Sequence, residues 1–230
     1  MSDRYGFVLL FYTGILILFV AVAVAVDNYG NRVSAVNQSL DSQLDQKQPR
    51  IALTFDDGPS YYTTALLEGL KEREVHATFF LMGKNIEGRE DIVRKMYQEG
   101  HLIGNHTYDH VDLTSISEEE ACIQITKTCN LIYEITGYYT TFVRPPFGLW
   151  PENIEYHVTM IPVLWSIDSL DWTTSDVDGT VKKVVSSARD GGIILMHDNY
   201  DSSVQSALQI VDQLKEKGYR FVTVDELLYE

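Results

Sequence analysis

Two adjacent carboxylates follow a short apolar segment at 51–55. Asp56 and Asp57 lie directly before a Gly58-Pro59 dipeptide, and Asp-Gly and Gly-Pro pairs are also common turn signals. Neighbouring carboxylates repel each other unless a proton or a cation lies between them. The pair therefore indicates either an ordinary turn or one part of a metal site.

A pair of histidines four positions apart is the second group with metal-binding chemistry. His106 and His110 enclose the sequence Thr107-Tyr108-Asp109, and on a turn of helix this spacing places both imidazoles on one face. Neutral imidazoles together with a carboxylate suit zinc or a neighbouring first-row ion. Histidines with this spacing also occur as solvated surface pairs, so the pair alone leaves that alternative open.

Three further polar groups each follow an apolar segment. Arg144 precedes two prolines that stiffen the chain, and a guanidinium can hold a carboxylate in its ionised form. His197 is either a structural histidine or a proton donor, and Asp171 is a candidate to fix its tautomer. Trp172 is either a core residue or a surface on which a sugar ring stacks.

The segments that must position these groups alternate between β-rich runs and helical spacing. We expect strands at 51–55, 77–82, 102–104, 142–144, 163–167, 193–196 and 221–224. We expect helices between them at 63–73, 90–99, 117–136, 177–189 and 203–217. Strands separated by helices imply parallel pairing, and the polar groups fall just past the carboxyl ends of several strands. The sequence therefore predicts an α/β sheet or barrel with one site built by many strands.

Composition narrows the partners and the cysteine chemistry. The chain has 230 residues with 18 Lys+Arg against 33 Asp+Glu and a net charge of -15. This is the opposite of the basic footprint that a phosphate backbone requires, so we do not expect a nucleic-acid partner. Cys122 and Cys129 lie about 10 Å apart in one expected helix, which is too far for a disulfide.

An uncharged apolar segment stands near the N-terminus at 7–26. A helix of this length spans about 30 Å, the thickness of a bilayer core. It is either an anchor or a signal peptide cleaved near Ala23-Val24-Ala25, and its length favours the anchor. We expect 1–26 to be the anchor or signal peptide, 27–46 a flexible tether and 47–230 the folded domain.

Either fate of the leader places the folded domain outside the cytoplasm. We expect a single-pass protein of the cell membrane with an extracytoplasmic domain, or a secreted protein if the leader is cut. The segment 47–230 is long enough for one substantial core and too short for two well-buried domains of typical size. We expect it to be a monomer.

Taken together, the five polar groups resemble the motifs of the NodB-type polysaccharide deacetylases, carbohydrate esterase family four. The family's motifs occur in order as TFDDGP from Thr54, H-T-x-x-H from His106, RPP from Arg144, D-x-x-D-W from Asp168 and L-x-H from Leu195. The resemblance covers about 50–224. It implies a distorted (β/α) barrel of about seven strands, preceded here by the transmembrane or signal helix.

The resemblance also implies roles for individual residues. It implies a divalent ion, zinc with cobalt or nickel as alternatives, bound by Asp57, His106 and His110. It implies Asp56 as general base oriented by Arg144, and His197 as general acid supported by Asp171. It implies substrate contacts from Pro146, Phe147, Trp172 and Leu195. Position 147 is often Tyr in the family; the Phe found here keeps the backbone N–H expected to hold an oxyanion and lacks the phenol.

The activity that the resemblance implies is removal of N-acetyl groups from an N-acetylglucosamine-containing polysaccharide. A tethered chain outside the membrane favours peptidoglycan as this partner. O-Deacetylation of acetylxylan and deacetylation of chitin oligomers are the alternatives among enzymes. A non-catalytic, membrane-tethered carbohydrate-binding protein is the alternative from another class. The presence of Asp56 and His197 argues against it, because a binding module needs neither a base nor an acid.

Overall fold

The structure is a computed structural model that describes residues 26, 28–34, 48–151 and 159–229. The chain divides into two compact units, 1–48 and 49–230. In the first unit, 28–34 is helical, and the expected anchor at 7–26 lies, apart from residue 26, outside the described residues. No described helix is both long enough and apolar enough to cross a bilayer.

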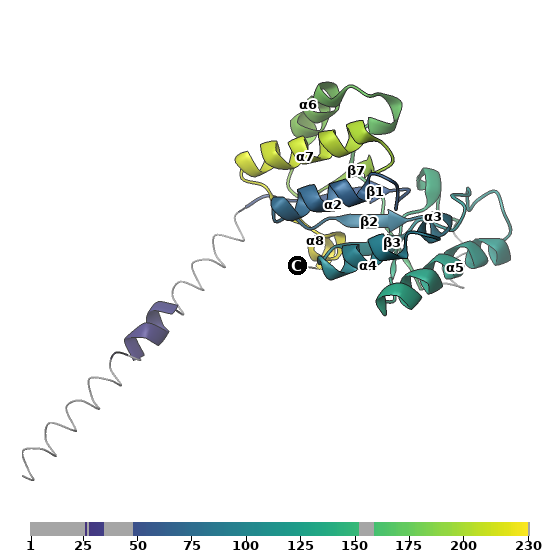
Figure 1. The fold of residues 1–230 in the computed structure, drawn as a ribbon, viewed down its shortest axis with the longest axis horizontal. Helices are drawn as coiled ribbons and strands as arrows, with labels where there is room; N and C mark the ends of the chain where they lie inside the picture. The colour runs from purple at the N-terminus through teal and green to yellow at the C-terminus, as the bar shows by residue number, and fades with distance from the viewer. Residues whose placement is uncertain (1–25, 27, 35–47, 152–158, 230) are drawn as a thin grey trace, which may run out of the picture. The chain divides into compact units, whose positions relative to one another are not determined.

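The second unit is built on a parallel sheet (Figure 1). The described strands are β1 (Arg50–Asp56), β2 (Thr78–Leu81), β3 (Leu102–Asn105), β4 (Phe142–Val143), β5 (Ile161–Pro162), β6 (Ile167–Asp168), β7 (Gly192–His197) and β8 (Arg220–Val222). Seven of them follow the order β5-β4-β3-β2-β1-β7-β6, and β8 also pairs with β1. All pairings are parallel. The predicted α/β class is confirmed. The described strands form an open, partial barrel whose two edge strands are β5 and β6.

Strand β1 is the centre of this sheet. One of its edges pairs with β7 from Ile51 to Asp56, and the other pairs with β8 near its start and with β2 near its end. Its residues from Ile51 to Phe55 are fully buried, which is what a strand covered on both faces requires. The register places Asp56 opposite His197 of β7. Two of the predicted functional residues are therefore neighbours at one edge of the sheet.

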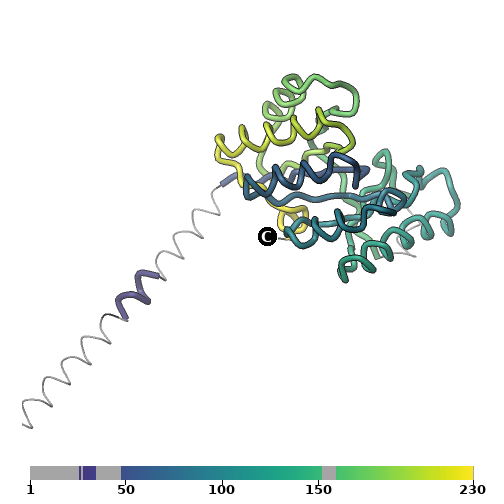
Figure 2. Tube along the Cα trace, in the orientation of Figure 1, coloured from purple at the N-terminus to yellow at the C-terminus, as the bar shows by residue number. Residues whose placement is uncertain are grey.

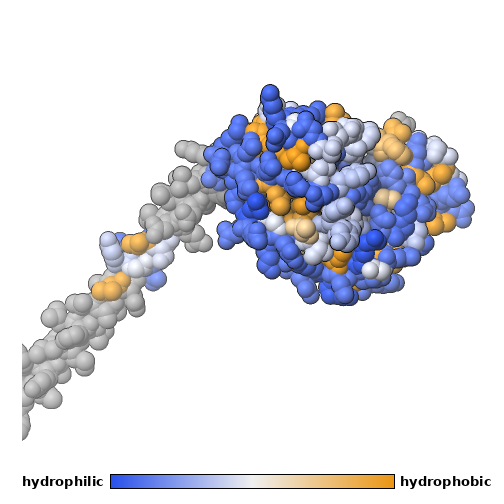
Figure 3. Space-filling model, turned by 45° about the horizontal axis from the view of Figure 1, so that its top comes forward, coloured by the Kyte–Doolittle hydropathy of each residue, from blue (hydrophilic) through white to orange (hydrophobic). Residues whose placement is uncertain are grey.

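Helices flank the sheet, and α2 and α7 lie side by side (Figure 2). The described helices are α2 (Thr63–Glu72), α3 (Gly83–Ile86), α4 (Glu90–Gln98), α5 (Glu118–Thr136), α6 (Val177–Ser187), α7 (Asp201–Glu216) and α8 (Val224–Tyr229). Gly69 allows the close approach of α2 to α7, because a Cβ there would lie 2.5 Å from the side chain of Leu208. The face turned forward in Figure 3 is mostly hydrophilic, with apolar side chains scattered over it.

Helix α5 has the clearest signals at its ends. Ser117 accepts a hydrogen bond from the backbone N–H of Glu120, whose side chain accepts one from the N–H of Ser117. This reciprocal pair is a capping box, and Gly137 ends the helix in the left-handed region with φ 72°. Cys122 and Cys129 on this helix are free thiols, as expected.

The strand predicted at 163–167 is wrong. The chain forms two short strands, β5 and β6, on either side of 163–166. The reason is a side chain from elsewhere: Arg144 donates to the carbonyls of Val163 at 3.0 Å and Leu164 at 3.3 Å, in place of a strand neighbour. The strand predicted at 221–224 ends earlier, at Val222, because Val224 begins α8.

Candidate active site

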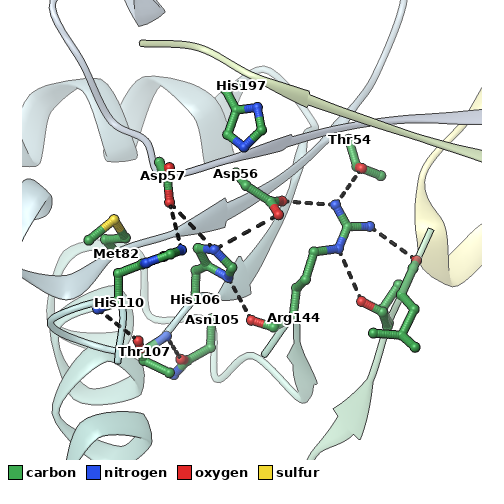
Figure 4. Close-up of polar contacts among 12 residues, drawn as sticks. Thr54, Asp56, Asp57, Met82, Asn105, His106, Thr107, His110, Arg144 and His197 are labelled. Atoms are coloured by element: carbon green, nitrogen blue, oxygen red, sulfur yellow. Dashed lines mark hydrogen bonds and ion pairs between the residues drawn. The ribbon is translucent and has the colours of Figure 1, made fainter. Parts of the chain in front are cut away.

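The predicted functional residues meet at the carboxyl edge of the sheet (Figure 4). Asp56 ends β1, His106 follows β3, Arg144 follows β4, and His197 ends β7. These strands are parallel neighbours or near neighbours, so their carboxyl ends open at the same edge. A cavity of about 490 Å³ lies there, and its polar lining includes Asp56, Asp57, His106, His110 and His197.

Three side chains in this cavity converge on one point. Oδ1 of Asp57 lies 3.4 Å from Nε2 of His106 and 3.6 Å from Nε2 of His110. One ligand atom from each residue lies within 4.8 Å of the other two. Oδ1 of Asp57 is buried without a hydrogen-bond partner in the described structure. A cation between these atoms would satisfy that oxygen, so the three residues fit a zinc-type ion.

The tautomer of His106 also fits metal binding. Nδ1 of His106 lies 2.6 Å from the backbone carbonyl of Arg144. A carbonyl only accepts, so Nδ1 must carry the proton, and the lone pair of Nε2 faces Asp57. Burial, followed by the neighbouring His106, lowers the pKa of His110, which favours the neutral imidazole that a metal ligand requires.

The segment 106–110 does not form the turn of helix on which the spacing of the two histidines would place them on one face. The segment is a loop in which Thr107 has φ 63° and His110 has φ 58°. The two imidazoles still meet, with ring centroids 4.9 Å apart. Asp57, Phe147 and Leu170 also have positive φ, and among the described non-glycine residues only Glu74 shares this property away from the site. Strained backbone is thus concentrated at the cavity, as is common where a site is preorganised.

Arg144 lies behind the cavity and holds Asp56. The guanidinium is fully buried and donates from Nη1 to Oδ1 of Asp56 at 2.8 Å and to Oγ1 of Thr54 at 2.6 Å. Its carbon lies 4.2 Å from the centroid of the Phe80 ring. Oδ2 of Asp56 points the other way and lies 3.9 Å from Nε2 of His106. One oxygen of Asp56 is therefore fixed by Arg144, and the other faces the predicted metal ligands.

His197 and Asp171 form a second pair across the cavity. Nδ1 of His197 donates to Oδ1 of Asp171 at 2.9 Å, and the backbone N–H of His197 donates to Oδ2 at 2.8 Å. Oγ of Ser169 also donates to Asp171, at 2.9 Å. Burial lowers the pKa of His197, but the hydrogen bond and charge of Asp171 outweigh it and raise the pKa to about 9. His197 is thus protonated near neutral pH.

The residues predicted to contact a substrate are only partly placed at the cavity. Phe147, Trp172 and Leu195 line it, and the residues Phe147 and Trp172 are 64% and 57% exposed. Pro146 is buried, and Pro145 lines the cavity in its place. The substrate contact expected from Pro146 stays a prediction.

Asp168, which the sequence places in the D-x-x-D-W motif, also lines the cavity. Sequence reasoning missed three other residues of the wall: Trp165, Asn199 and Tyr200. Asn199 and Tyr200 lie in the short connection between the end of β7 and the start of α7. The rule that sites form at the carboxyl ends of parallel strands could have found them. Trp165 lies in the segment that the sequence pattern assigned to a strand.

Comparisons with known proteins agree with this arrangement. A family profile described as polysaccharide deacetylase matches residues 43–162, which is more than half of the chain. The peptidoglycan-N-acetylglucosamine deacetylase PgdA of Listeria monocytogenes is 40% identical over 79% of this chain and 39% of its own length. The peptidoglycan-N-acetylmuramic acid deacetylase PdaC of Bacillus subtilis is 39% identical over 81% of this chain and 40% of its own length.

A solved structure gives the same result for the fold. The structure of the peptidoglycan deacetylase PdaC from Bacillus subtilis matches with a TM-score of 0.77 and 39% identity, over 79% of this chain and 91% of that chain. The chain spans about two fifths of the length of the two curated relatives above. The family profile, the relatives and the fold all agree with the five motifs: the chain belongs to the polysaccharide deacetylase family.

Proposed function

We propose that the chain is a metal-dependent hydrolase that removes N-acetyl groups from an N-acetylglucosamine-containing polysaccharide, peptidoglycan. The observation that carries this proposal is the presence in one cavity of a metal-type triad, the Asp56–Arg144 pair and the His197–Asp171 pair. The names of the relatives support the polymer, because both act on peptidoglycan.

Asp57, His106 and His110 would hold the ion. One carboxylate and two imidazoles suit zinc, with cobalt or nickel as alternatives. When bound, such an ion lowers the pKa of a water molecule and polarises a carbonyl. Three protein ligands also leave room for water and the acetyl group, which is typical of a catalytic rather than a structural site.

Asp56 is the general base. Arg144 holds Oδ1 by a charge-assisted hydrogen bond and keeps the carboxylate oriented. Oδ2 is the atom that faces the triad, so it is the atom that takes the proton from the attacking water. Arg144 acts through Asp56 and is a positioning residue, because its guanidinium is fully buried behind the cavity.

His197 is the general acid. Asp171 binds Nδ1, so the proton on Nε2 is the one available to the cavity. An amine leaves poorly unless it is protonated, and His197 supplies that proton as the carbon–nitrogen bond breaks. General acid catalysis of this kind contributes about a hundred- to ten-thousand-fold in rate. Phe147 lines the cavity, and its backbone N–H would help to stabilise the oxyanion.

The exposed rings at the cavity bind the sugar. Trp172 and Tyr200 line the cavity with half of their surface exposed, and aromatic faces of this kind contribute large contact area at low entropy cost. The ring of Phe147 packs edge-on against His110, with centroids 4.9 Å apart. It therefore brings an apolar surface next to the proposed metal site.

The proposal extends to location. The apolar segment 7–26 supports a membrane anchor or a cleaved leader, and peptidoglycan lies outside the cytoplasmic membrane. We therefore place the domain on the outer side, as a monomer tethered by its N-terminal segment.

The test is acetate release by the purified chain from three polymers: peptidoglycan, chitin oligomers and acetylxylan. We expect the highest rate on peptidoglycan and no release after treatment with a chelator. A preference for acetylxylan would move the activity to ester hydrolysis. Binding to the polymers without acetate release would support the non-catalytic alternative.

A further inference from the structure

The loop between the two histidines is held in an unusual conformation. Thr107 and His110 both occupy the left-handed region, where residues with a side chain persist only if their surroundings over-determine them. His110 is one of the three predicted metal ligands. The groups that hold this loop therefore decide where one ligand of the site lies.

The carbonyl groups of the loop are bound from one side by the start of α3. The backbone N–H of Gly83 donates to the carbonyl of Thr107 at 2.9 Å, and that of Lys84 donates to the carbonyl of Tyr108 at 3.1 Å. Nζ of Lys84 donates to the carbonyl of Asp109 at 3.2 Å. Three consecutive carbonyl groups thus have partners on α3.

The amide groups in the middle of the loop are bound from the opposite side by a single side chain of α5. Oε1 of Gln124 accepts from the backbone N–H of Tyr108 at 3.0 Å and from that of Asp109 at 2.8 Å. Nε2 of Gln124 donates to Oδ2 of Asp109 at 3.0 Å. The residue is half-buried; its hydrogen bond from Tyr108 is partly buried, and the two with Asp109 are exposed.

The amide groups at the two ends of the loop have local partners (Figure 4). The N–H of Thr107 donates to Oδ1 of Asn105 at 2.8 Å, and the N–H of His110 donates to Oγ1 of Thr107 at 3.1 Å. Nδ2 of Asn105 donates to the carbonyl of Ile125 on α5 at 2.8 Å. The middle of the loop has no such local partner: Tyr108 and Asp109 depend on Gln124.

We propose that Gln124 is a positioning residue for the metal site. Its side chain binds Tyr108 and Asp109, between the two histidines, and so fixes these peptide units against α5. This inference rests on the proposed metal site at Asp57, His106 and His110. Without the glutamine, two adjacent amides lose their acceptor, and the loop that leads to His110 is held only by its partners on α3 and by its local hydrogen bonds.

The first test is Gln124→Ala in the full chain, with zinc affinity measured by competition with a chelating dye. We expect the affinity to fall about ten- to a hundredfold, the usual effect of removing a residue that orients metal ligands. The matched control is Gln209→Ala, the same change on an exposed position of α7, which should leave the affinity within twofold. An affinity within twofold of wild type for Gln124→Ala would overturn the proposal.

A second test does not depend on an alanine variant that folds. Gln124→Glu places a carboxylate against that of Asp109, and we expect zinc affinity to fall at least fivefold. Adding Asp109→Asn restores a donor–acceptor pair with the direction reversed and returns the net charge to that of wild type. We expect the double variant to bind zinc within twofold of wild type. A double variant no better than Gln124→Glu alone would contradict the proposal.

Unfolding temperatures with and without zinc distinguish a positioning role of Gln124 from a general effect on stability. Zinc binding by the wild type distinguishes a failure of this inference from a failure of the proposed function. In excess chelator, the unfolding temperature of Gln124→Ala should lie somewhat below that of Gln209→Ala, because two amides have lost their acceptor, and the rise in unfolding temperature caused by zinc should also be smaller. If the unfolding temperature of Gln124→Ala falls as much in chelator as it does with zinc, Gln124 has a merely structural role. Wild-type zinc binding is measured first: its absence would refute the proposed metal site, whereas normal binding by every Gln124 variant would refute only this inference.

Discussion

Arg144 and Asp56 form a buried ion pair that joins the ends of two strands separated by 88 positions in the sequence. The guanidinium also donates to Thr54 and to the carbonyls of Val163 and Leu164. One side chain therefore orients the proposed base and organises the segment between β5 and β6. This explains why an arginine can be fully buried at the edge of a catalytic cavity.

The first prediction concerns Asp56. Asp56→Asn removes the proton acceptor and leaves Asp57, His106 and His110 intact, so zinc binding should persist while acetate release falls about a hundred- to ten-thousand-fold. The measurements are kcat for acetate release and zinc affinity by dye competition. Full activity in this variant would show that another group is the base.

The second prediction concerns pH and His197. An acid must be protonated, and the pKa of about 9 means that acetate release should be present below this pH and lost as the pH rises through it. Because this pKa is raised above its ordinary value, the same pair stabilises the fold fully below pH 6.5 and loses this contribution as the pH rises through about 9.

The variant Asp171→Asn tests the predicted loss of acetate release at alkaline pH. It removes the charge that raises the pKa of His197, so the loss of kcat at high pH should move to lower pH. His197→Ala should fold and bind zinc but release acetate slowly. An unchanged alkaline limb in Asp171→Asn, or near-normal release by His197→Ala, would remove the acid role.

The third prediction concerns the stability of the fold at acidic pH and a histidine outside the cavity lining, His101. Nδ1 of the buried His101 accepts from the backbone N–H of Ala77 at 3.0 Å, and protonation would abolish that acceptor. Burial, and then the charge of His76, lowers the pKa of His101 from 6.5 to about 4. Stability should be full above pH 6.5 and fall as the pH drops toward 4, by about 3 kcal/mol at most.

Urea unfolding at pH 7, 5 and 4 measures this loss. His101→Gln does not titrate, and its amide oxygen can still accept from Ala77, so its free energy of unfolding should depend less on pH in this window. The same pH slope in wild type and in this variant would show that other groups cause the acid sensitivity.

Local signals predicted much of the fold. The end of α5 follows from Gly137, its start follows from the capping box at Ser117, and the buried run at 51–55 predicts a central strand. The segment 163–167 was misread because two of its carbonyls, those of Val163 and Leu164, are bound by the side chain of Arg144, nearly twenty residues earlier, and no local pattern reports such a contact.

The site also combines features that the local sequence predicts with features that depend on residues distant in the sequence. The residue types and their position after strands predicted one shared site, and the family resemblance predicted that Asp57, His106 and His110 would meet there. The spacing of the two histidines did not predict the loop between them, because partners on α3 and α5 hold its conformation. Gln124 carries no chemical signature of its own. Its position matters only once α5 packs beside the loop, which is why the sequence pattern alone did not single it out.

Zinc titration of the chelator-treated full chain, followed by acetate release from peptidoglycan, tests the central claim most directly. Activity should be absent in the metal-free protein and return as one equivalent of zinc is added, whereas His106→Ala should neither bind zinc tightly nor recover activity. Full acetate release by the metal-free protein, or equal recovery by His106→Ala, would contradict a metal site built from Asp57, His106 and His110.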